Sequence, residues 1–159
     1  ATKAGARFTD PHDATVAVLA QGLLDLGLLN KDQHGTAKDV IERRAYFQFY
    51  MHRTGHWLGM DVHDCGSYVE PGEVGQVSER KDPLSGETIT NRPSRILQPG
   101  MVLTIEPGLY VRPAAGVPEA FHNLGIRIED DAIVTPAGCE LITRGVPVKA
   151  DEIEALMRG

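Results

Sequence analysis

Hydrophobic residues near the start of the chain recur with the spacing of one face of an α-helix. Thr9-Asp10-Pro11 is a helix-start signal, because a capping side chain stands ahead of proline in the first turn. Gly27 is expected to end the helix. Between these limits the apolar positions follow the i, i+3, i+4, i+7, i+8 series of an amphipathic helix: Val16, Leu19, Ala20, Leu23 and Leu24.

A second helix is expected after a polar turn that spans residues 30–35. Thr36 can cap this helix, and Val40 and Ile41 carry its apolar face towards Phe47. Four aromatic residues crowd the chain at this point, and we expect them to join the core rather than contact a ligand: Tyr46, Phe47, Phe49 and Tyr50.

The second half of the chain has the short apolar runs and turn residues of β-strands. Residues 101–105 predict a buried strand that ends at Glu106, and further strands are expected at 109–111, 126–134 and 140–143. Helices followed by antiparallel strands joined by turns indicate the α+β class. The length of 159 residues suits one domain, residues 1–159.

Two segments fall outside this regular pattern. Residues 70–95 are rich in glycine, proline and charge, and predict a long surface loop or small hairpin with a possible strand at 88–90. A loop of this length within a compact domain is often functional, although a tolerated surface insertion is at least as common an explanation. The tail from Asp151 to Met157 predicts a short helix capped by Asp151.

Composition and charge exclude several classes of protein. The net charge of −6 makes nucleic acid a poor partner, and no apolar run approaches the roughly 20 residues that span a bilayer. Cys65 and Cys139 form neither a disulfide framework nor a metal knuckle. We interpret both as reduced thiols, which predicts a cytoplasmic protein.

Candidate chemistry is concentrated in residues 52–64, which hold three of the six histidines. His52 and His56 have the spacing of the zincin motif HExxH, but Arg53 stands where that motif has its general-base glutamate. A zincin is therefore set aside. Residues 57–59 predict a tight turn after His56. Because three histidines crowd together with glycines and carboxylates, a metal or catalytic site is favoured over a structural role, and His63 completes the group.

Two carboxylates join these histidines as candidates. Glu106 ends a buried strand, and Glu129 alternates with Arg127 on a later strand, so Arg127 and Glu129 should face the same way. A buried carboxylate needs a cation, hydrogen bonds or a metal ion, and both Arg127 and a metal ion are candidate partners. Mixed oxygen and imidazole donors favour Mn, Co or Fe over a structural zinc bound by thiolates.

Three motifs together resemble one family of enzymes. They are HRTGHWLGMDVHD at 52–64, LQPGMVLTIEPGLYV at 97–111 and GIRIEDD at 125–131. In these motifs the chain resembles the aminopeptidase P, prolidase and methionine aminopeptidase superfamily of metallopeptidases, and the match is closest to the bacterial Xaa-Pro aminopeptidases. The resemblance covers nearly the whole chain except the longer 70–95 segment. It implies the pita-bread fold, with a curved antiparallel sheet and covering helices.

The resemblance implies a site with two divalent metal ions, of which Mn is expected and Co, Fe or Zn are alternatives. It implies that His56, Glu106 and Glu129 are metal ligands, that Glu129 bridges the two metals, and that Glu106 also transfers a proton at the attacking water. The implied reaction removes the N-terminal residue of a peptide with proline in second position, by attack of a metal-bound hydroxide.

The remaining implied residues contact substrate. His63 is expected to be catalytic, since it matches the histidine that hydrogen-bonds the scissile carbonyl and stabilises the developing oxyanion. His52 matches a histidine that lines the proline side of the cleft, and we expect it to act in both binding and catalysis. Arg127 matches an arginine beside the bridging glutamate and is expected to help bind substrate.

The family's site also uses two aspartates that lie upstream of the residues present here. Asp10 and Asp13 lie at a helix start, so we do not assign them as replacements for these two aspartates. Asp61 and Asp64 are expected to be structural. We therefore expect the chain to be the C-terminal half of the pita-bread domain and inactive alone. Its expected partners are the missing N-terminal part of the same protein, an Xaa-Pro peptide and further copies in a homo-oligomer.

Three alternatives remain open. Within the enzyme class, a prolidase-type dipeptidase and a methionine aminopeptidase share the motifs, although the wording WLGMDVHD and GIRIEDD favours aminopeptidase P. From a different class, a non-catalytic homologue could bind a peptide or a partner in the same cleft. None of the three motifs is damaged, so this last alternative ranks well below the enzyme.

Overall fold

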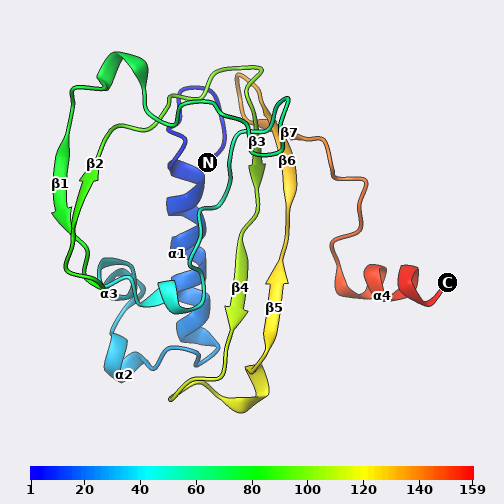
Figure 1. The fold of residues 1–159 in the computed structure, drawn as a ribbon. Coiled ribbons are helices and arrows are strands. Elements are labelled where there is room, and N and C mark those ends of the chain that lie inside the picture. The colour runs from blue at the N-terminus through cyan, green and yellow to red at the C-terminus, as the bar shows by residue number, and fades with distance from the viewer.

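The long helix near the start of the chain is α1, Asp10–Asp25, in a computed structural model that describes all 159 residues (Figure 1). The helix begins and ends as expected, and Gly27 follows it with a φ of 69°. Its start differs in detail, because Thr9 makes no capping bond and pairs with the Ser94 hydroxyl at 3.0 Å. Of the five predicted apolar positions, Leu19 is half-buried and four are buried: Val16, Ala20, Leu23 and Leu24.

The next helical segment is shorter than expected. The polar turn contains a single helical turn, α2, Lys31–His34, and α3, Ala37–Glu42, follows with the predicted Thr36 cap, which forms a reciprocal capping box with Asp39. Arg44 then adopts a left-handed φ of 55° and separates α3 from the 3₁₀ turn η1, Ala45–Gln48. The prediction of one continuous helix to Phe47 was therefore wrong.

Three of the four aromatic residues around η1 belong to the core, as predicted, and Phe47 does not. Phe49 and Tyr50 are essentially inaccessible and Tyr46 is buried, whereas Phe47 is half-buried. The three buried rings pack on the apolar face of α1, so the helical layer has its own core of 12 buried residues, which includes Val111 and Val117 from the strand region.

Seven strands form three antiparallel groups. The central group has the order β3-β6-β7, with β6 between the other two strands, and the second group pairs β4 with β5. The expected 70–95 segment contains a separate hairpin of β1 and β2. The bounds are β1 Ser78–Lys81, β2 Thr88–Asn91, β3 Val102–Ile105, β4 Gly108–Val111, β5 Leu124–Arg127, β6 Asp130–Val134 and β7 Cys139–Leu141, with 3₁₀ turns η2 Pro71–Glu73 and η3 Glu119–Phe121.

Strands β3 and β4 form one bent ribbon with β5 and β6. Ile105 pairs with Asp130 and Gly108 pairs with Arg127, so the register does not change between the two groups. The two intervening positions on each strand therefore match one to one. Glu106, at the junction on one strand, is placed opposite Glu129 on the other.

A second, smaller core lies under the β3-β6 pair. Trp57, Leu97, Leu103 and Val134 are buried there, and Phe8 packs against them. Leu103 and Val134 come from the two paired strands, whereas Trp57 comes from residues 52–58, which we call the histidine segment. This core therefore fixes the histidine segment on the sheet.

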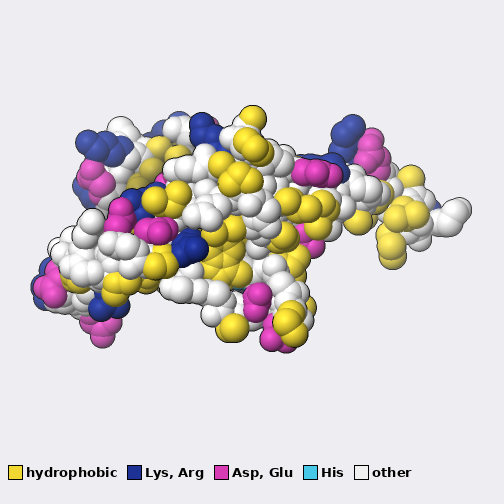
Figure 2. Space-filling model, turned by 90° about the horizontal axis from the view of Figure 1, so that it is seen from above, with side chains coloured by type: hydrophobic (Ala, Val, Ile, Leu, Met, Phe, Trp, Pro, Cys, Tyr) yellow, Lys and Arg dark blue, Asp and Glu magenta, His cyan; other side chains and the backbone are white.

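The last helix, α4, Ala150–Arg158, projects away from the body of the protein (Figures 1 and 2). Asp151 does not cap it, contrary to prediction, because Lys149 occupies the cap position without a side-chain bond. Leu156 and Met157 are 67% and 80% exposed. No helix in the structure is both long enough and apolar enough to span a membrane.

Candidate active site

The histidine segment lies as an extended strand-like edge against β3. The backbone N–H of Glu106 donates to the Thr54 carbonyl at 2.6 Å, and the N–H of Thr104 donates to the His56 carbonyl at 3.0 Å. Trp57 forms a bridge in the same series. The tight turn predicted at 57–59 is therefore wrong at its start, because these backbone groups find their partners on β3.

Gly55 allows this close approach. A Cβ atom at position 55 would lie 1.9 Å from the Thr104 carbonyl oxygen, which is less than any real contact. Only glycine can occupy the position without moving the segment away from β3.

His56 and Glu106 meet across this pairing. His56 Nε2 lies 3.3 Å from Glu106 Oε1, and both side chains are largely buried. His56 Nδ1 is 2.9 Å from the Trp57 carbonyl oxygen, which can only accept, so Nδ1 carries the proton. In a neutral ring the Nε2 lone pair therefore faces a carboxylate oxygen. A cation between the two atoms, either a proton or a metal ion, would satisfy both.

Thr104 positions this pair, a role that the sequence analysis missed. Its hydroxyl donates to Glu106 Oε1 at 3.0 Å and accepts the backbone N–H of His56 at 3.0 Å. Thr104 is buried on β3, two residues before Glu106, which directly follows that strand. The i, i+2 spacing on a strand face was the available signal.

Arg127 is the partner of Glu106, one of the two alternatives left open by the sequence. Its Nη1 lies 3.1 Å from Glu106 Oε2, and its Nε donates to the Tyr110 hydroxyl at 2.8 Å. The hydrogen bond to Tyr110 raises the pKa of Arg127 above its usual value. Tyr110 then donates to His52 Nε2 at 3.0 Å, because His52 Nδ1 is committed to the Arg53 carbonyl at 2.7 Å.

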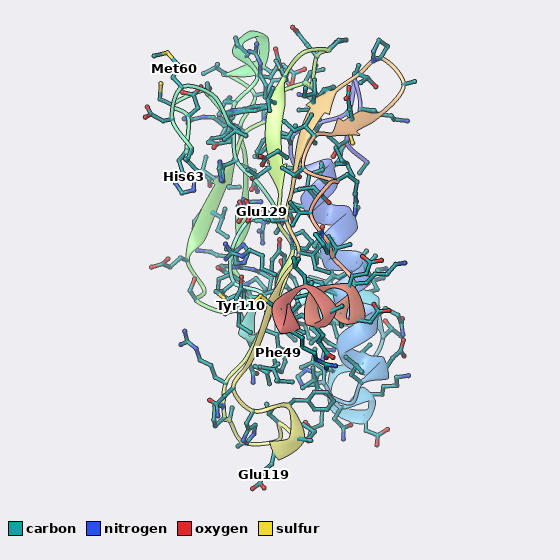
Figure 3. The ribbon with its side chains drawn as sticks, turned by 90° about the vertical axis from the view of Figure 1, so that its right-hand side faces the viewer. Phe49, Met60, His63, Tyr110, Glu119 and Glu129 are labelled. Carbon is teal, nitrogen blue, oxygen red and sulfur yellow. The ribbon has the colours of Figure 1, made fainter.

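The other two candidates are both exposed and come from different parts of the fold. His63 is exposed on the loop that follows the histidine segment, and its ring centroid is 4.1 Å from that of His56, with the planes at 83°. Glu129 lies at the junction of β5 and β6, opposite Glu106 by register, and is exposed (Figure 3). Like charges directly opposite on neighbouring strands repel each other, so this position favours a bound cation.

A cleft of about 1120 Å³ brings most of the candidates together. The predicted site residues on its lining are His52, His56, His63, Glu106 and Arg127, whereas Glu129 is not among the lining residues. The cleft slightly exceeds the usual 300–1,000 Å³ of small-ligand pockets and is open enough for a peptide.

The donor chemistry suits a divalent metal ion only in part. One imidazole nitrogen and one carboxylate oxygen converge at His56 and Glu106, and Glu129 provides a second carboxylate on the facing strand. No three His, Cys, Asp or Glu side chains are close enough together to hold a metal ion. Two of the three predicted ligands are therefore adjacent, and the third is placed by strand register alone.

A buried group behind the histidines supports them. The Thr54 hydroxyl lies 2.6 Å from the Tyr50 hydroxyl and 3.1 Å from His12 Nδ1. Burial, followed by the charge of Arg53, lowers the pKa of His12 from 6.5 to about 4. Burial also raises the pKa of Tyr50. His12 is therefore a neutral hydrogen-bonding group at physiological pH, and the sequence analysis did not single it out.

Of the four aspartates that the sequence analysis set aside, Asp10, Asp61 and Asp64 do not line the cleft, whereas Asp13 does. Asp10 accepts a hydrogen bond from the Arg7 backbone at 2.8 Å, and Asp64 accepts one from the Cys65 backbone at 2.9 Å. Asp13 lines the cleft, and burial raises the pKa of its carboxyl.

Residues 1–136 match the metallopeptidase family M24, so the chain belongs to this family. It is 42% identical over 153 residues to the Xaa-Pro aminopeptidase of Escherichia coli, covering 96% of this chain and 29% of that protein. It is 40% identical over 153 residues to the Xaa-Pro aminopeptidase of Haemophilus influenzae, with coverage of 96% and 30%. The chain thus spans about 30% of the length of these relatives.

Solved structures show the same fold. The aminopeptidase PepP of Pseudomonas aeruginosa superposes with a TM-score of 0.79 and 42% identity, covering 99% of this chain and 30% of that protein. Escherichia coli aminopeptidase P with the inhibitor Pro-Leu gives a TM-score of 0.76 and 41% identity, with the same coverage. The expected pita-bread fold of the α+β class is therefore confirmed.

Proposed function

We propose that the protein containing this chain is a metal-dependent aminopeptidase that removes the N-terminal residue from peptides with proline in second position. The Xaa-Pro aminopeptidases of Escherichia coli and Haemophilus influenzae support this proposal. Because the chain spans about 30% of their length, we propose that it acts with further residues of the same protein that complete the site.

The observation that carries the proposal is the contact of His56 with Glu106. Nε2 of the histidine and Oε1 of the glutamate are 3.3 Å apart, and the Nδ1–H bond to the Trp57 carbonyl keeps the Nε2 lone pair on the cleft side. A backbone carbonyl that fixes the tautomer in this way is typical of histidines that bind metal ions through the other nitrogen.

We assign His56, Glu106 and Glu129 as the residues of this chain that hold two divalent metal ions. The metal ions, when bound, supply activation of the water that attacks the peptide. Glu106 accepts the proton of that water, and Thr104 and Arg127 hold its two oxygens in place. Among divalent metals we place Mn first, with Co, Fe and Zn as alternatives, because the donors are oxygen and a single imidazole.

The remaining residues bind the peptide. We assign His63 to hydrogen-bond the scissile carbonyl, because its exposed ring lies beside His56 at the cleft. His52 is assigned to the proline side of the substrate, where Tyr110 and Arg127 hold its ring. Arg127 thus acts on both Glu106 and the substrate side.

The test is hydrolysis of an Xaa-Pro-Xaa peptide with added Mn, by this chain and by the longest natural protein that contains it. We expect cleavage by the longer protein and its loss on chelation. His56→Ala, Glu106→Ala and Glu129→Ala should each abolish activity of the longer protein. Cleavage by the chain alone would show that the site needs no further ligands, and no cleavage by either protein would favour a non-catalytic peptide-binding homologue.

A second candidate is a dipeptidase. The Xaa-Pro dipeptidase of Rattus norvegicus is 36% identical over 174 residues, and the chain covers 33% of it. Comparing Ala-Pro with Ala-Pro-Ala as substrates separates the two activities. Cleavage restricted to the dipeptide would replace the proposed aminopeptidase.

Two further proposals concern the cellular location and the oligomeric state of the protein. Cys65 and Cys139 are free thiols, which supports our proposal of a cytoplasmic location. We also propose a homo-oligomer, which sedimentation of the longer protein would test.

A further inference from the structure

The cleft is rich in arginine although the chain as a whole is acidic. The net charge is −6, yet the lining of the cleft holds more cationic than anionic side chains. Only two carboxylates, Asp13 and Glu106, are on the lining, against five arginines: Arg7, Arg53, Arg80, Arg92 and Arg127. A concentration of one charge in a concave site attracts ligands of the opposite charge.

Two of these arginines are already neutralised. Arg7 forms an ion pair with Glu73 at 2.7 Å, and Arg127 forms its pair with Glu106 at 3.1 Å. Arg53, Arg80 and Arg92, by contrast, make no side-chain ion pair or hydrogen bond within the protein. Arg92 lines only the main cleft, whereas Arg53 and Arg80 also line a second hollow. The charge of these two guanidinium groups is therefore available to a ligand.

Arg53 and Arg80 also lie where two hollows adjoin. Both line the main cleft and a smaller hollow of about 240 Å³, and His52 and Asn91 line both hollows as well. Arg53 follows His52, so it is adjacent to the proposed proline-side histidine. Arg80 belongs to β1 and approaches from the hairpin, which stands as a separate arm of the molecule (Figure 1).

The hairpin is held in place by an ion pair. Asp82, directly after β1, pairs with Arg44 of the helical layer, and both side chains are largely shielded from solvent. Arg80 precedes Asp82 by two residues, so both side chains are on the face that turns towards the helical layer. A hairpin with two four-residue strands is marginal on its own, so this contact positions Arg80.

We propose that Arg53 and Arg80 form an anion subsite that binds a carboxylate of the peptide substrate away from the bond that is cleaved. This inference rests on the proposed peptidase function and adds a substrate class to it. The charge of Arg53 acts on the carboxyl of Asp13, and the charge of Arg80 acts on that of Asp82, but neither aspartate forms an ion pair with these arginines. The two carboxylates therefore reduce the local charge without occupying the guanidinium groups. Guanidinium groups bind carboxylates with two parallel hydrogen bonds, which makes them selective for this group.

The test uses four tetrapeptides and the longest natural protein that contains this chain, with Mn. The peptides are Ala-Pro-Ala-Glu and Ala-Pro-Ala-Gln, each with a free or an amidated C-terminus. Arg53→Gln and Arg80→Gln are compared with wild type. The control is Arg112→Gln, which removes the same charge from an exposed position outside the cleft.

We expect each cleft variant to raise KM about five- to tenfold for peptides with the recognised carboxylate, with kcat unchanged. The control should match wild type. An effect on both free acids identifies the terminal carboxylate, and an effect on both Glu peptides identifies the side chain. The difference should also shrink at 1 M salt.

Two other results overturn the inference. If all four peptides are cleaved and the variants change KM equally for each, no anion subsite exists, and the proposed peptidase function still stands. If wild type cleaves none of the peptides, the proposed function fails and the substrate assignment fails with it.

Discussion

The Thr104 hydroxyl lies 3.0 Å from Glu106 Oε1 and donates its hydrogen to that carboxylate. The hydroxyl oxygen of Thr104 also accepts a hydrogen bond from the backbone N–H of His56. One buried side chain therefore links the carboxylate of Glu106, directly after β3, to the histidine segment, and it positions both groups of the proposed metal site.

Replacing Thr104 by valine should reduce activity without removing a metal ligand. The change keeps the shape of the side chain but leaves a buried carboxylate oxygen and an N–H without a partner, which costs about 1–3 kcal/mol. We expect kcat/KM of the longer protein to fall roughly tenfold. Thr104→Ser keeps the hydroxyl and should restore most of the activity. Equal loss in both variants would contradict a hydrogen-bonding role.

The Glu129→Gln variant should be more stable than wild type when no metal is present. Removing one of two carboxylates that face each other across the β3-β4 and β5-β6 ribbon relieves a repulsion of about 0.2–1 kcal/mol. Added Mn should then stabilise wild type in thermal unfolding but not the variant. Glu140→Gln, on the exposed edge of β7, is the control and should respond to Mn as wild type does. Equal Mn stabilisation in Glu129→Gln would remove Glu129 from the ligand set.

The Gly55→Ala variant should destabilise the protein by breaking the backbone contact between the histidine segment and β3. Its Cβ would meet the Thr104 carbonyl, so the histidine segment must move away from β3. We expect a loss of about 1–3 kcal/mol in urea unfolding together with loss of activity. Gly22→Ala, inside α1 with open space around it, should instead stabilise by about 0.5–1 kcal/mol. A stable, active Gly55→Ala protein would show that the segment does not need this close approach.

His12 should make stability depend on pH in mildly acidic solution. Its pKa is lowered from 6.5 to about 4 in the fold, so between these values the unfolded chain binds more protons than the folded one. The contribution of neutral His12 is therefore complete above pH 6.5 and is lost as the pH falls towards 4. We expect a loss of about 1–2 kcal/mol, since the ring is partly exposed. His12→Gln should flatten the urea-unfolding profile in this window, and an unchanged profile would contradict the assignment.

His63→Ala should lower turnover in the longer protein while the metal content is retained. The ring lies on an exposed loop beside His56 and would act on the substrate carbonyl, so kcat should fall about 10²–10³-fold. Metal analysis of the purified variant provides the check. Met60→Ala, at the fully exposed tip of the same loop, is the control. Loss of bound metal from His63→Ala would refute the role.

Local sequence patterns predicted the parts of the fold that depend on local physics. The period of α1, the Thr36 cap and the strand that ends at Glu106 each follow from neighbouring residues. The end of α3 did not, because it depends on the left-handed backbone of Arg44, which carries no glycine signal. The extended form of 56–58 was also missed, since its hydrogen-bond partners lie on β3, far along the chain.

The residues of the candidate site likewise fall into those that local sequence predicted and those that it did not. The sequence motifs predicted six site residues, and five of them line one cleft in the structure. Thr104 and Tyr110 were missed because their roles depend on which side chains they meet across strands. The position of Glu129 opposite Glu106 required the register of two separate strand pairs, which no single segment of sequence records.

The projecting α4 has a consequence for handling the protein. Its apolar side chains Leu156 and Met157 are in water, and the connection before it, residues 145–149, is mostly exposed and follows the Arg144–Asp130 ion pair. An exposed connection of this kind is readily cleaved by proteases. The exposed apolar side chains of α4 promote adsorption to surfaces and aggregation. Cleavage at this connection would remove α4 and leave the cleft intact, because no residue of α4 lines the cleft.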